Sequence, residues 1–262
     1  MLDRIFDLAK IQNKIINFSK PLKKKYYDYL VHEFGILFTY HSNRIEGTNM
    51  TLTLNDTREI LNNTYQIETT MDKKRQREIK ETINHQKAFQ YIFDTLKEDI
   101  DIITRMKTLH QIIGNEAIEN DGDYKRRENY LINSSGKEIE FTKPSFVPLR
   151  MEELKKEYET TWQNLTAFER AVRLHMAIVN IHPFCDGNGR VARLIMNYEL
   201  IKWAYPPILI NEKQKLSYYS MIEEININTD YQNNPLKIGD ITLFCETIEQ
   251  LSVMTFKNMQ KD

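Results

Sequence analysis

Positions 182–193 read His-Pro-Phe-Cys-Asp-Gly-Asn-Gly-Arg-Val-Ala-Arg, between two apolar stretches at 167–180 and 189–203. Both stretches carry apolar residues at helical spacing. A proline and two glycines between 182 and 189 predict a tight loop that joins the two helices. Polar side chains therefore gather between two apolar helices, and this helix–loop–helix unit points to a helical fold.

The composition of the rest of the chain also favours helices. The 262 residues include only 8 glycines and 7 prolines, well below the share of about 12% in average proteins. One β-hairpin is expected, with Tyr130–Ile132 and Glu138–Phe141 flanking a turn at 133–136. Apolar periodicity predicts the other helices at about 3–18, 21–45, 55–61, 72–97, 101–113, 151–164, 213–224 and 238–257. The expected boundary residues are Pro21 at a start, Gly47 and Gly114 at ends, and Asn55 or Asp56 as a cap.

Charge and cysteine content exclude several classes of protein. There are 36 basic and 37 acidic residues, so no net field favours nucleic acid or an anionic membrane. Cys185 and Cys245 do not make a disulfide framework, and no Cys/His spacing suggests zinc. No leader pattern and no apolar run of membrane-spanning length is present, so a cytoplasmic protein is expected.

The loop has the features of an anion site. The amides of Gly187 and Gly189 fall at the start of the following helix, where free N–H groups and the helix dipole favour an anion. Arg190 and Arg193 are three apart and share one face of that helix. We call this helix start, with the amides of Gly187 and Gly189, the anion cradle. Two guanidinium groups beside it indicate a polyphosphate.

Two further residues of the loop add chemistry. A carboxylate at Asp186, next to several phosphates, suggests Mg²⁺. His182 can accept a proton near neutral pH and suits a general base. Each feature alone is more often a turn or a structural residue, but base, metal ligand and phosphate clamp at this spacing together predict nucleotide transfer.

At every specified position the segment resembles the Fic family motif, His-Pro-Phe-x-Asp/Glu-Gly-Asn-Gly/Lys-Arg-x-x-Arg. The resemblance implies an all-α Fic fold, a helical bundle with one β-hairpin flap. It implies that His182 deprotonates a target hydroxyl and that Phe184 anchors the loop. Asp186 would hold Mg²⁺ on the α- and β-phosphates of ATP. The implied nucleotide-binding residues are Asp186, Gly187, Asn188, Gly189, Arg190, Val191, Ala192 and Arg193.

The resemblance also suggests the reaction. In the family the hydroxyl attacks the α-phosphate and pyrophosphate leaves. Doc-type toxins, which phosphorylate, carry Lys where this chain has Gly189. The glycine therefore favours transfer of AMP to a Ser, Thr or Tyr hydroxyl of a target protein, with self-modification as one case. Transfer of UMP stays open, because the cradle contacts phosphates rather than the base.

An upstream segment, Ser42-Asn43-Arg44-Ile45-Glu46-Gly47, resembles the family's inhibitory helix, Ser/Thr-x-x-x-Glu-Gly/Asn, and is followed by Thr48-Asn49-Met50-Thr51-Leu52. The resemblance implies that Glu46 pairs with Arg193 and that Ser42 supports it. Arg193 cannot serve both a carboxylate and a phosphate, so the protein would be autoinhibited.

Weaker similarities concern the flap and the adenosine site. Gly122-Asp123-Tyr124-Lys125 resembles the segment before the flap, with Lys where Arg is usual. Ile132 is the candidate flap residue that pins the target side chain or the nucleotide. Tyr218, Tyr219 and Asn226 resemble the adenosine-binding stretch, although two tyrosines packing a helix is an alternative.

The expected organisation is one compact unit over 1–262, with an N-terminal helical elaboration at 1–65 and a Fic core at 66–262. Two rival functions remain: removal of AMP from a modified protein with Glu46 as a catalytic group, and a nucleotide-binding regulator with little turnover. The target protein and the oligomeric state, including a homodimer, stay open. His175 is expected in the core, and Cys185 takes no nucleophilic role. No metal-ligand spacing links His32, His41, His85 and His110.

Overall fold

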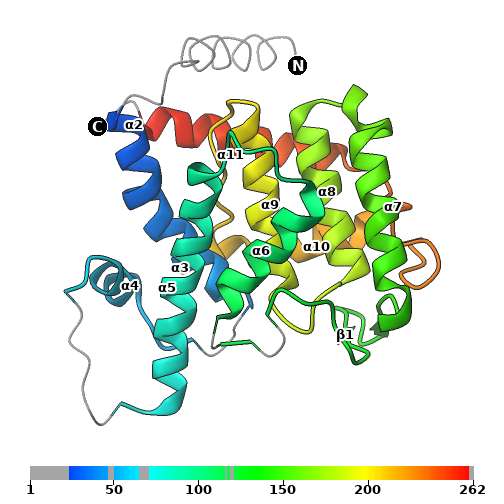
Figure 1. Ribbon diagram of the computed structural model, residues 1–262, viewed down its shortest axis with the longest axis horizontal. Helices are drawn as coiled ribbons and strands as arrows, with labels where there is room; N and C mark the ends of the chain where they lie inside the picture. Colours follow the sequence, from blue (N-terminus) through cyan, green and yellow to red (C-terminus); the bar gives the residue numbers. More distant parts are fainter. Residues whose placement is uncertain (1–23, 47–49, 65–70, 116, 119–120, 260–262) are drawn as a thin grey trace.

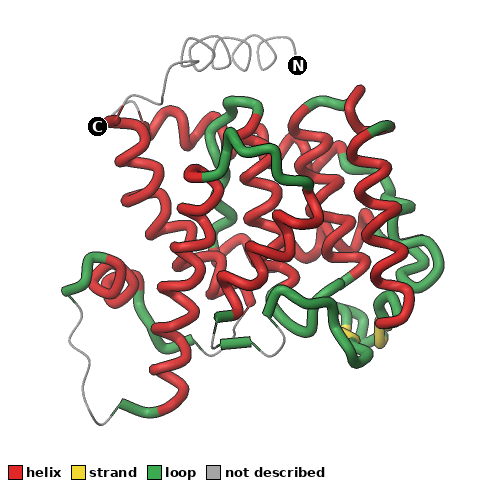
Figure 2. Tube along the Cα trace, in the orientation of Figure 1, coloured by secondary structure: helices red, strands yellow, loops and turns green. Residues whose placement is uncertain are grey.

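The computed structural model describes residues 24–46, 50–64, 71–115, 117–118 and 121–259. Helices dominate these residues, and one small antiparallel hairpin accompanies them (Figures 1 and 2). The elements before the loop are α2 (Lys24–Tyr29), the π-helical η1 (Leu30–Phe34), α3 (Gly35–Glu46), α4 (Leu54–Leu61), α5 (Lys73–Asp94), α6 (Ile102–Gly114), β1 (Tyr130–Ile132), β2 (Glu138–Glu140), the 3-10 turn η2 (Pro144–Phe146), α7 (Val147–Glu159), the 3-10 turn η3 (Thr161–Asn164) and α8 (Ala167–Ile181). After it come α9 (Asn188–Lys202), the 3-10 turn η4 (Glu212–Gln214), α10 (Lys215–Ile225) and α11 (Thr242–Met259).

The centre of the molecule is the pair α8 and α9, the two helices that flank the loop. Thr166 and Glu169 form a capping box that fixes the start of α8. Helices α3, α5 and α6 pack against α9, and α7 and α11 pack against α8, so α9 is buried along nearly its whole length (Figure 1). Burial on several sides explains why the apolar pattern of α9 is not confined to one face. The loop between the two helices is thus held by the most buried part of the fold.

Several helix boundaries differ from the sequence-based expectation: α5 ends at Asp94 instead of 97, α7 ends at Glu159 instead of 164, and three helices begin elsewhere. Helix α4 begins after Thr53, whose hydroxyl accepts from the amide of Asp56 while the Asp56 carboxylate accepts from the amide of Thr53. The predicted caps Asn55 and Asp56 were therefore wrong, because Thr53 can form the reciprocal box. Helix α7 begins at Val147 instead of 151, since a proline in the first turn is compatible with a helix. Helix α11 begins at Thr242 instead of 238, where the Asp240 carboxylate accepts from the Thr242 amide.

Other boundaries agree with expectation. Asp72 and Asp101 cap α5 and α6 through their side chains, and α6 ends at Gly114. Three predictions lie outside the described residues: the helix at 3–18, the helix start at Pro21 and the helix end at Gly47. Within the described part of the chain, no helix has the length and hydropathy needed to cross a membrane.

The hairpin lies at one end of the helical body (Figure 2). The predicted hairpin is present, and Tyr130 pairs with Glu140 and Ile132 with Glu138 in antiparallel register. The tip is tied to α10, because the Ser134 amide donates to the Glu223 carboxylate over 2.9 Å. Phe141, directly after β2, stacks on His182 at the end of α8, so the hairpin lies beside the loop.

Candidate active site

His182 ends helix α8 in an unusual backbone conformation. Its φ of 53° and ψ of 60° are left-handed, which turns the chain sharply out of the helix. The ring Nδ1 lies 3.2 Å from the Val179 carbonyl oxygen, so Nδ1 carries the proton and donates it there. The lone pair therefore sits on Nε2, the nitrogen free to accept a proton.

The environment of His182 keeps the ring neutral. Phe141 stacks on the imidazole with ring centroids 3.9 Å apart and an interplanar angle of 13°. Burial, together with the nearby Lys125 charge, lowers the pKa of His182 to about 4, against the hydrogen bond to Val179, which raises it. A neutral imidazole with Nε2 unprotonated is the form that a general base needs at neutral pH.

Hydrogen bonds within the 182–189 loop and a buried side chain fix its conformation. The Phe184 amide donates to the Asn188 side-chain oxygen over 2.9 Å, and the Asn188 side-chain nitrogen donates to the Phe184 carbonyl over the same distance. The Phe184 side chain is fully buried and stacks on His110, with centroids 3.9 Å apart. Asn188 thus acts on the loop backbone, which is a structural role beyond the phosphate contact expected for it.

His110 is a loop-holding residue that the sequence did not reveal. Its Nδ1 accepts from the Gly122 amide over 2.8 Å, and its Nε2 donates to the Asp186 carbonyl over 3.1 Å. Burial lowers the pKa of His110 to about 4, which keeps this donor–acceptor arrangement. A lone histidine in an apolar helix gives no signal of such a bridge, because its partners come from two distant loops.

The cradle at the start of α9 has the expected geometry. Gly187 has a φ of 76°, which favours glycine, and α9 begins at the next residue. A Cβ on Gly189 would lie 2.2 Å from Glu46 Oε1. The Glu46 carboxylate therefore occupies the space directly above the first turn of α9, where an anion would bind.

Glu46 and Ser42 hold Arg193 from helix α3. Glu46 Oε1 lies 2.7 Å from Arg193 Nη2, which is the ion pair that the resemblance implied. Arg193 Nε donates to the Ser42 hydroxyl over 3.0 Å, and Nη2 donates to the Ser42 carbonyl over 2.9 Å. The Arg193 side chain is buried, so these charge-assisted contacts fix its position.

The end of helix α3 is tied to the rest of the protein. Arg44 forms an ion pair with Glu212 of η4 and donates to the Met50 carbonyl over 2.9 Å. The Tyr219 hydroxyl donates to the Ile45 carbonyl over 3.2 Å. Because these contacts surround Glu46, they hold its carboxylate over α9.

Asp186 fits the role of a metal ligand shared with phosphates. Its Oδ1 accepts from the Gly187 amide over 2.6 Å, and its side chain is half exposed. Its Oδ2 lies 3.7 Å from Nη2 of Arg190, beyond hydrogen-bond distance. One available carboxylate oxygen beside an anion cradle suits Mg²⁺, which usually takes one or two carboxylates together with phosphate oxygens and water.

Several expected nucleotide contacts lie in the core. The side chains of Val191 and Ala192 are fully buried, so only their backbone faces the cradle. Tyr218 is 2% exposed and its hydroxyl lies 2.6 Å from His175 Nε2. The expectation that the Tyr218 ring flanks the base is not supported, since the ring packs inside the protein. His175 itself lies in the core, as expected.

The Asn226 side chain is already hydrogen-bonded, whereas the Tyr219 side chain is partly exposed. The Asn226 and Asn180 amides exchange two hydrogen bonds of 3.0 and 2.7 Å, so the Asn226 side chain already has its partner. Its expected contact with a base would have to break this exchange. Tyr219 is 37% exposed, and its hydroxyl contacts the Ile45 carbonyl next to Glu46 at the end of α3.

The flap faces a groove of about 800 Å³. Residues 133–140 of the hairpin line one side, and the end of α10 with the segment 226–232 lines the other. Ile132 is 66% exposed on β1 and does not line this groove. The Lys125 amide donates to the Pro183 carbonyl over 2.8 Å, so the segment before the flap is fastened to the loop at the position where Arg was expected.

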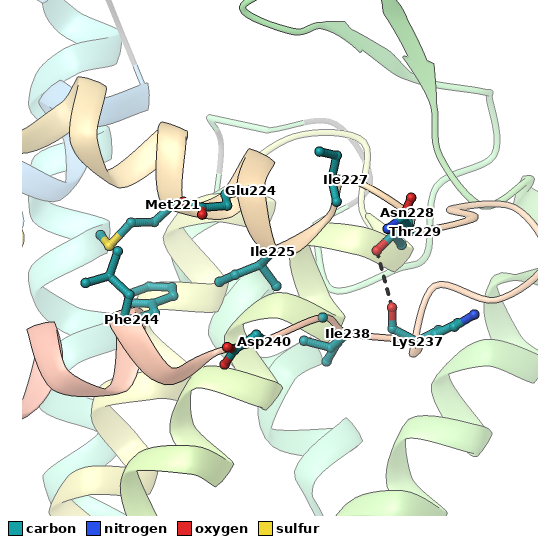
Figure 3. A pocket seen from close by; sticks show the side chains of 12 residues that line it. Met221, Glu224, Ile225, Ile227, Asn228, Thr229, Lys237, Ile238, Asp240 and Phe244 are labelled. Carbon is teal, nitrogen blue, oxygen red and sulfur yellow. Dashed lines mark hydrogen bonds between the residues drawn. The ribbon is translucent and has the colours of Figure 1, made fainter.

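A second cavity, of about 580 Å³, lies between α10, α11 and the segment that joins them (Figure 3). Met221 and Ile225 of α10 face Phe244 of α11 across it. The joining segment is pinned there by the Thr229 hydroxyl, which donates to the Lys237 carbonyl over 3.3 Å. The lining contains no residue of 182–193, so this cavity is separate from the cradle.

The comparisons with known proteins agree with this geometry. Residues 99–200 match the model of the Fic/DOC family. The chain contains a Fic domain. It is 34% identical over 193 residues to the protein adenylyltransferase Fic of Drosophila melanogaster, covering 71% of this chain and 36% of that protein. A protein of the same name from Nematostella vectensis is 29% identical over 239 residues, covering 86% of this chain and 50% of that protein.

The chain thus spans about a third to a half of the length of these curated relatives. A Fic domain containing signaling protein from Bacteroides thetaiotaomicron has a similar structure, with a TM-score of 0.81 at 24% identity. The alignment covers 98% of this chain and 95% of that one. The expected all-α Fic fold with one hairpin is therefore confirmed.

Proposed function

We propose that this Fic-domain chain transfers AMP from ATP to a Ser, Thr or Tyr hydroxyl of a protein, including its own. The names of its relatives, protein adenylyltransferase Fic, support this activity. The observation that carries the proposal is the position of a neutral His182, with Nε2 unprotonated, at the mouth of a glycine-rich helix start.

The chemistry assigns one task to each group. His182 Nε2 takes the proton of the target hydroxyl while that oxygen attacks the α-phosphorus of ATP. The bond from the α-phosphorus to the bridging oxygen breaks, and pyrophosphate leaves with that electron pair. We assign the binding of its charge to Arg190 and Arg193, which both lie in the first two turns of α9. Mg²⁺ held by Asp186 would neutralise the phosphate oxygens.

We further propose that Glu46 inhibits this reaction. Its carboxylate takes both the guanidinium of Arg193 and the space above Gly189. A triphosphate would need that guanidinium and that space at the same time. With Glu46 in place, bound ATP would therefore lack the contact between Arg193 and its γ-phosphate. Its α-phosphate would then not be oriented for attack.

A second candidate is the reverse reaction, removal of AMP from a modified protein. The same observation favours it, because the carboxylate of Glu46 lies above the cradle and could orient a water molecule there. A regulator that only binds nucleotide is disfavoured, because such a protein needs no base at His182.

The test is intact-mass spectrometry after incubation with ATP and Mg²⁺. Glu46→Gly protein should gain the mass of AMP, and Glu46→Gly with His182→Ala should not. AMP on both proteins would remove His182 as the base. If neither gains mass, release of AMP from a modified protein becomes the leading candidate, and incubation of AMP-modified protein with the wild type tests it.

A further inference from the structure

A third arginine lies beside the cradle, on a helix outside the 182–193 segment. Arg77 of α5 places its Nη2 3.7 Å from Asp186 Oδ2. Arg190 Nη2 lies at the same distance from the same oxygen. Two guanidinium groups from different helices therefore face one carboxylate oxygen, and neither is close enough to hydrogen-bond to it.

Glu81 aligns the two arginines. Arg77 Nε donates to Glu81 Oε1 over 2.9 Å, and Glu81 Oε2 lies 4.0 Å from Arg190 Nη1. Glu81 thus binds Nε of Arg77, while Nη2 of the same guanidinium lies 3.7 Å from Asp186 Oδ2. This is the orientation in which a guanidinium group can receive a second anion.

The charges at this place leave room for an anionic ligand. Arg77 and Arg190 contribute two positive charges, and Glu81 and Asp186 contribute two negative ones. A Mg²⁺ ion on Asp186 would make the cluster positive, and the terminal phosphates of a nucleotide would restore the balance. Arg190 is 4% exposed, yet its buried Nε has no hydrogen-bond partner among the described residues.

We infer that Arg77 is a phosphate-binding residue that reaches the β- and γ-phosphates of the nucleotide. Its guanidinium group lies near Asp186, from which it would turn to the phosphates once Asp186 holds a cation. The side chain of Arg77 is 56% exposed, so it can make this small movement without disturbing the core. The inference rests on the proposed function, because it assumes a nucleoside triphosphate in the cradle.

The experiment measures binding and needs no turnover. In the Glu46→Gly protein, Arg77→Ala and Arg77→Lys are compared with Lys87→Ala, which removes an exposed charge farther along the same helix. Dissociation constants for ATP, ADP and AMP are measured by calorimetry with Mg²⁺ present. We expect Arg77→Ala to weaken ATP about fivefold and AMP hardly at all, because an exposed charged contact contributes about 1 kcal/mol. Arg77→Lys should restore part of the loss, and Lys87→Ala should change nothing.

Two outcomes would overturn the inference. Unchanged ATP affinity in Arg77→Ala would show that Arg77 does not contact the phosphates. Equal weakening of ATP and AMP would mean that the substitution disturbs the site as a whole. Failure of the Glu46→Gly parent to bind any of the three nucleotides is a different result: it would refute the proposed function itself, and the inference with it.

Discussion

Glu46 Oε1 lies 2.7 Å from Arg193 Nη2, although the two residues are 147 positions apart. Glu46 is the last residue of α3, and Arg193 lies in the second turn of α9. Arg193 is buried, so its charge needs a partner in the absence of phosphate. The carboxylate supplies that partner and at the same time covers the cradle.

Removal of this carboxylate should activate the protein. Glu46→Gly should raise self-modification at least tenfold, because Arg193 and the space above Gly189 become available to the triphosphate. Labelled ATP and autoradiography measure the change. Glu159→Gly is the matched control, since Glu159 is likewise the exposed last residue of a helix. Equal labelling of wild type and Glu46→Gly would contradict autoinhibition.

The pH dependence of transfer should reflect the neutral state of His182. Burial holds its pKa at about 4, so the base is unprotonated above that value and becomes protonated only below it. In Glu46→Gly protein, kcat/KM should not fall between pH 8 and pH 5 through protonation of His182. A descending limb with a midpoint near 6.5 would show that the imidazole is not shielded as the structure indicates.

Stability should fall in acid because of His175. Burial lowers its pKa to about 3, below the unfolded value of about 6.5, so the unfolded chain binds more protons between these values. This contribution is therefore present at neutral pH and is lost as the pH falls. The free energy of unfolding should fall from pH 7.5 to pH 4.5 in both proteins. The fall should be about 2–3 kcal/mol smaller in His175→Gln than in wild type.

Urea unfolding at the two pH values measures the effect of His175. His32→Gln, at an exposed position, is the control for a change of histidine content. The same pH-dependent loss in wild type and His175→Gln would show that other groups cause the acid sensitivity.

The crowding above Gly189 should make two substitutions non-additive. In wild type a Cβ at this position would meet Glu46 Oε1 at 2.2 Å, so Gly189→Ala should displace the carboxylate and destabilise the protein. In Glu46→Gly protein that clash is absent, and alanine in a helix is favoured over glycine by up to about 1 kcal/mol. The double-mutant cycle should give a coupling of about 1 kcal/mol or more. Thermal unfolding of the four proteins measures it, and additive effects would place Glu46 away from the cradle.

The sequence predicted the elements of the fold because the signals for them are local. Apolar spacing located the helices, and the turn at 133–136 located the hairpin. Boundaries were less accurate, since caps such as Thr53 depend on a reciprocal bond with a residue further along. The loop at 182–189 was predicted from its proline and glycines.

The candidate site was predicted unevenly. The 182–193 segment is contiguous, so its spacing alone indicated a base beside a phosphate cradle. Tyr218 and Asn226 were expected to face a nucleotide, but burial and the exchange with Asn180 occupy them. His110 and Arg77 gave no signal, because their partners are distant in sequence.

By itself, the sequence determined the helical fold and the chemical groups of the loop, because periodicity, turn residues and motif spacing are properties of neighbouring positions. Only the tertiary structure decided which groups meet. It placed Glu46 over Gly189, stacked Phe141 on His182 and brought Arg77 to Asp186. The physical reason is that burial and charge pairing depend on how the helices pack, and packing joins residues that no local pattern connects.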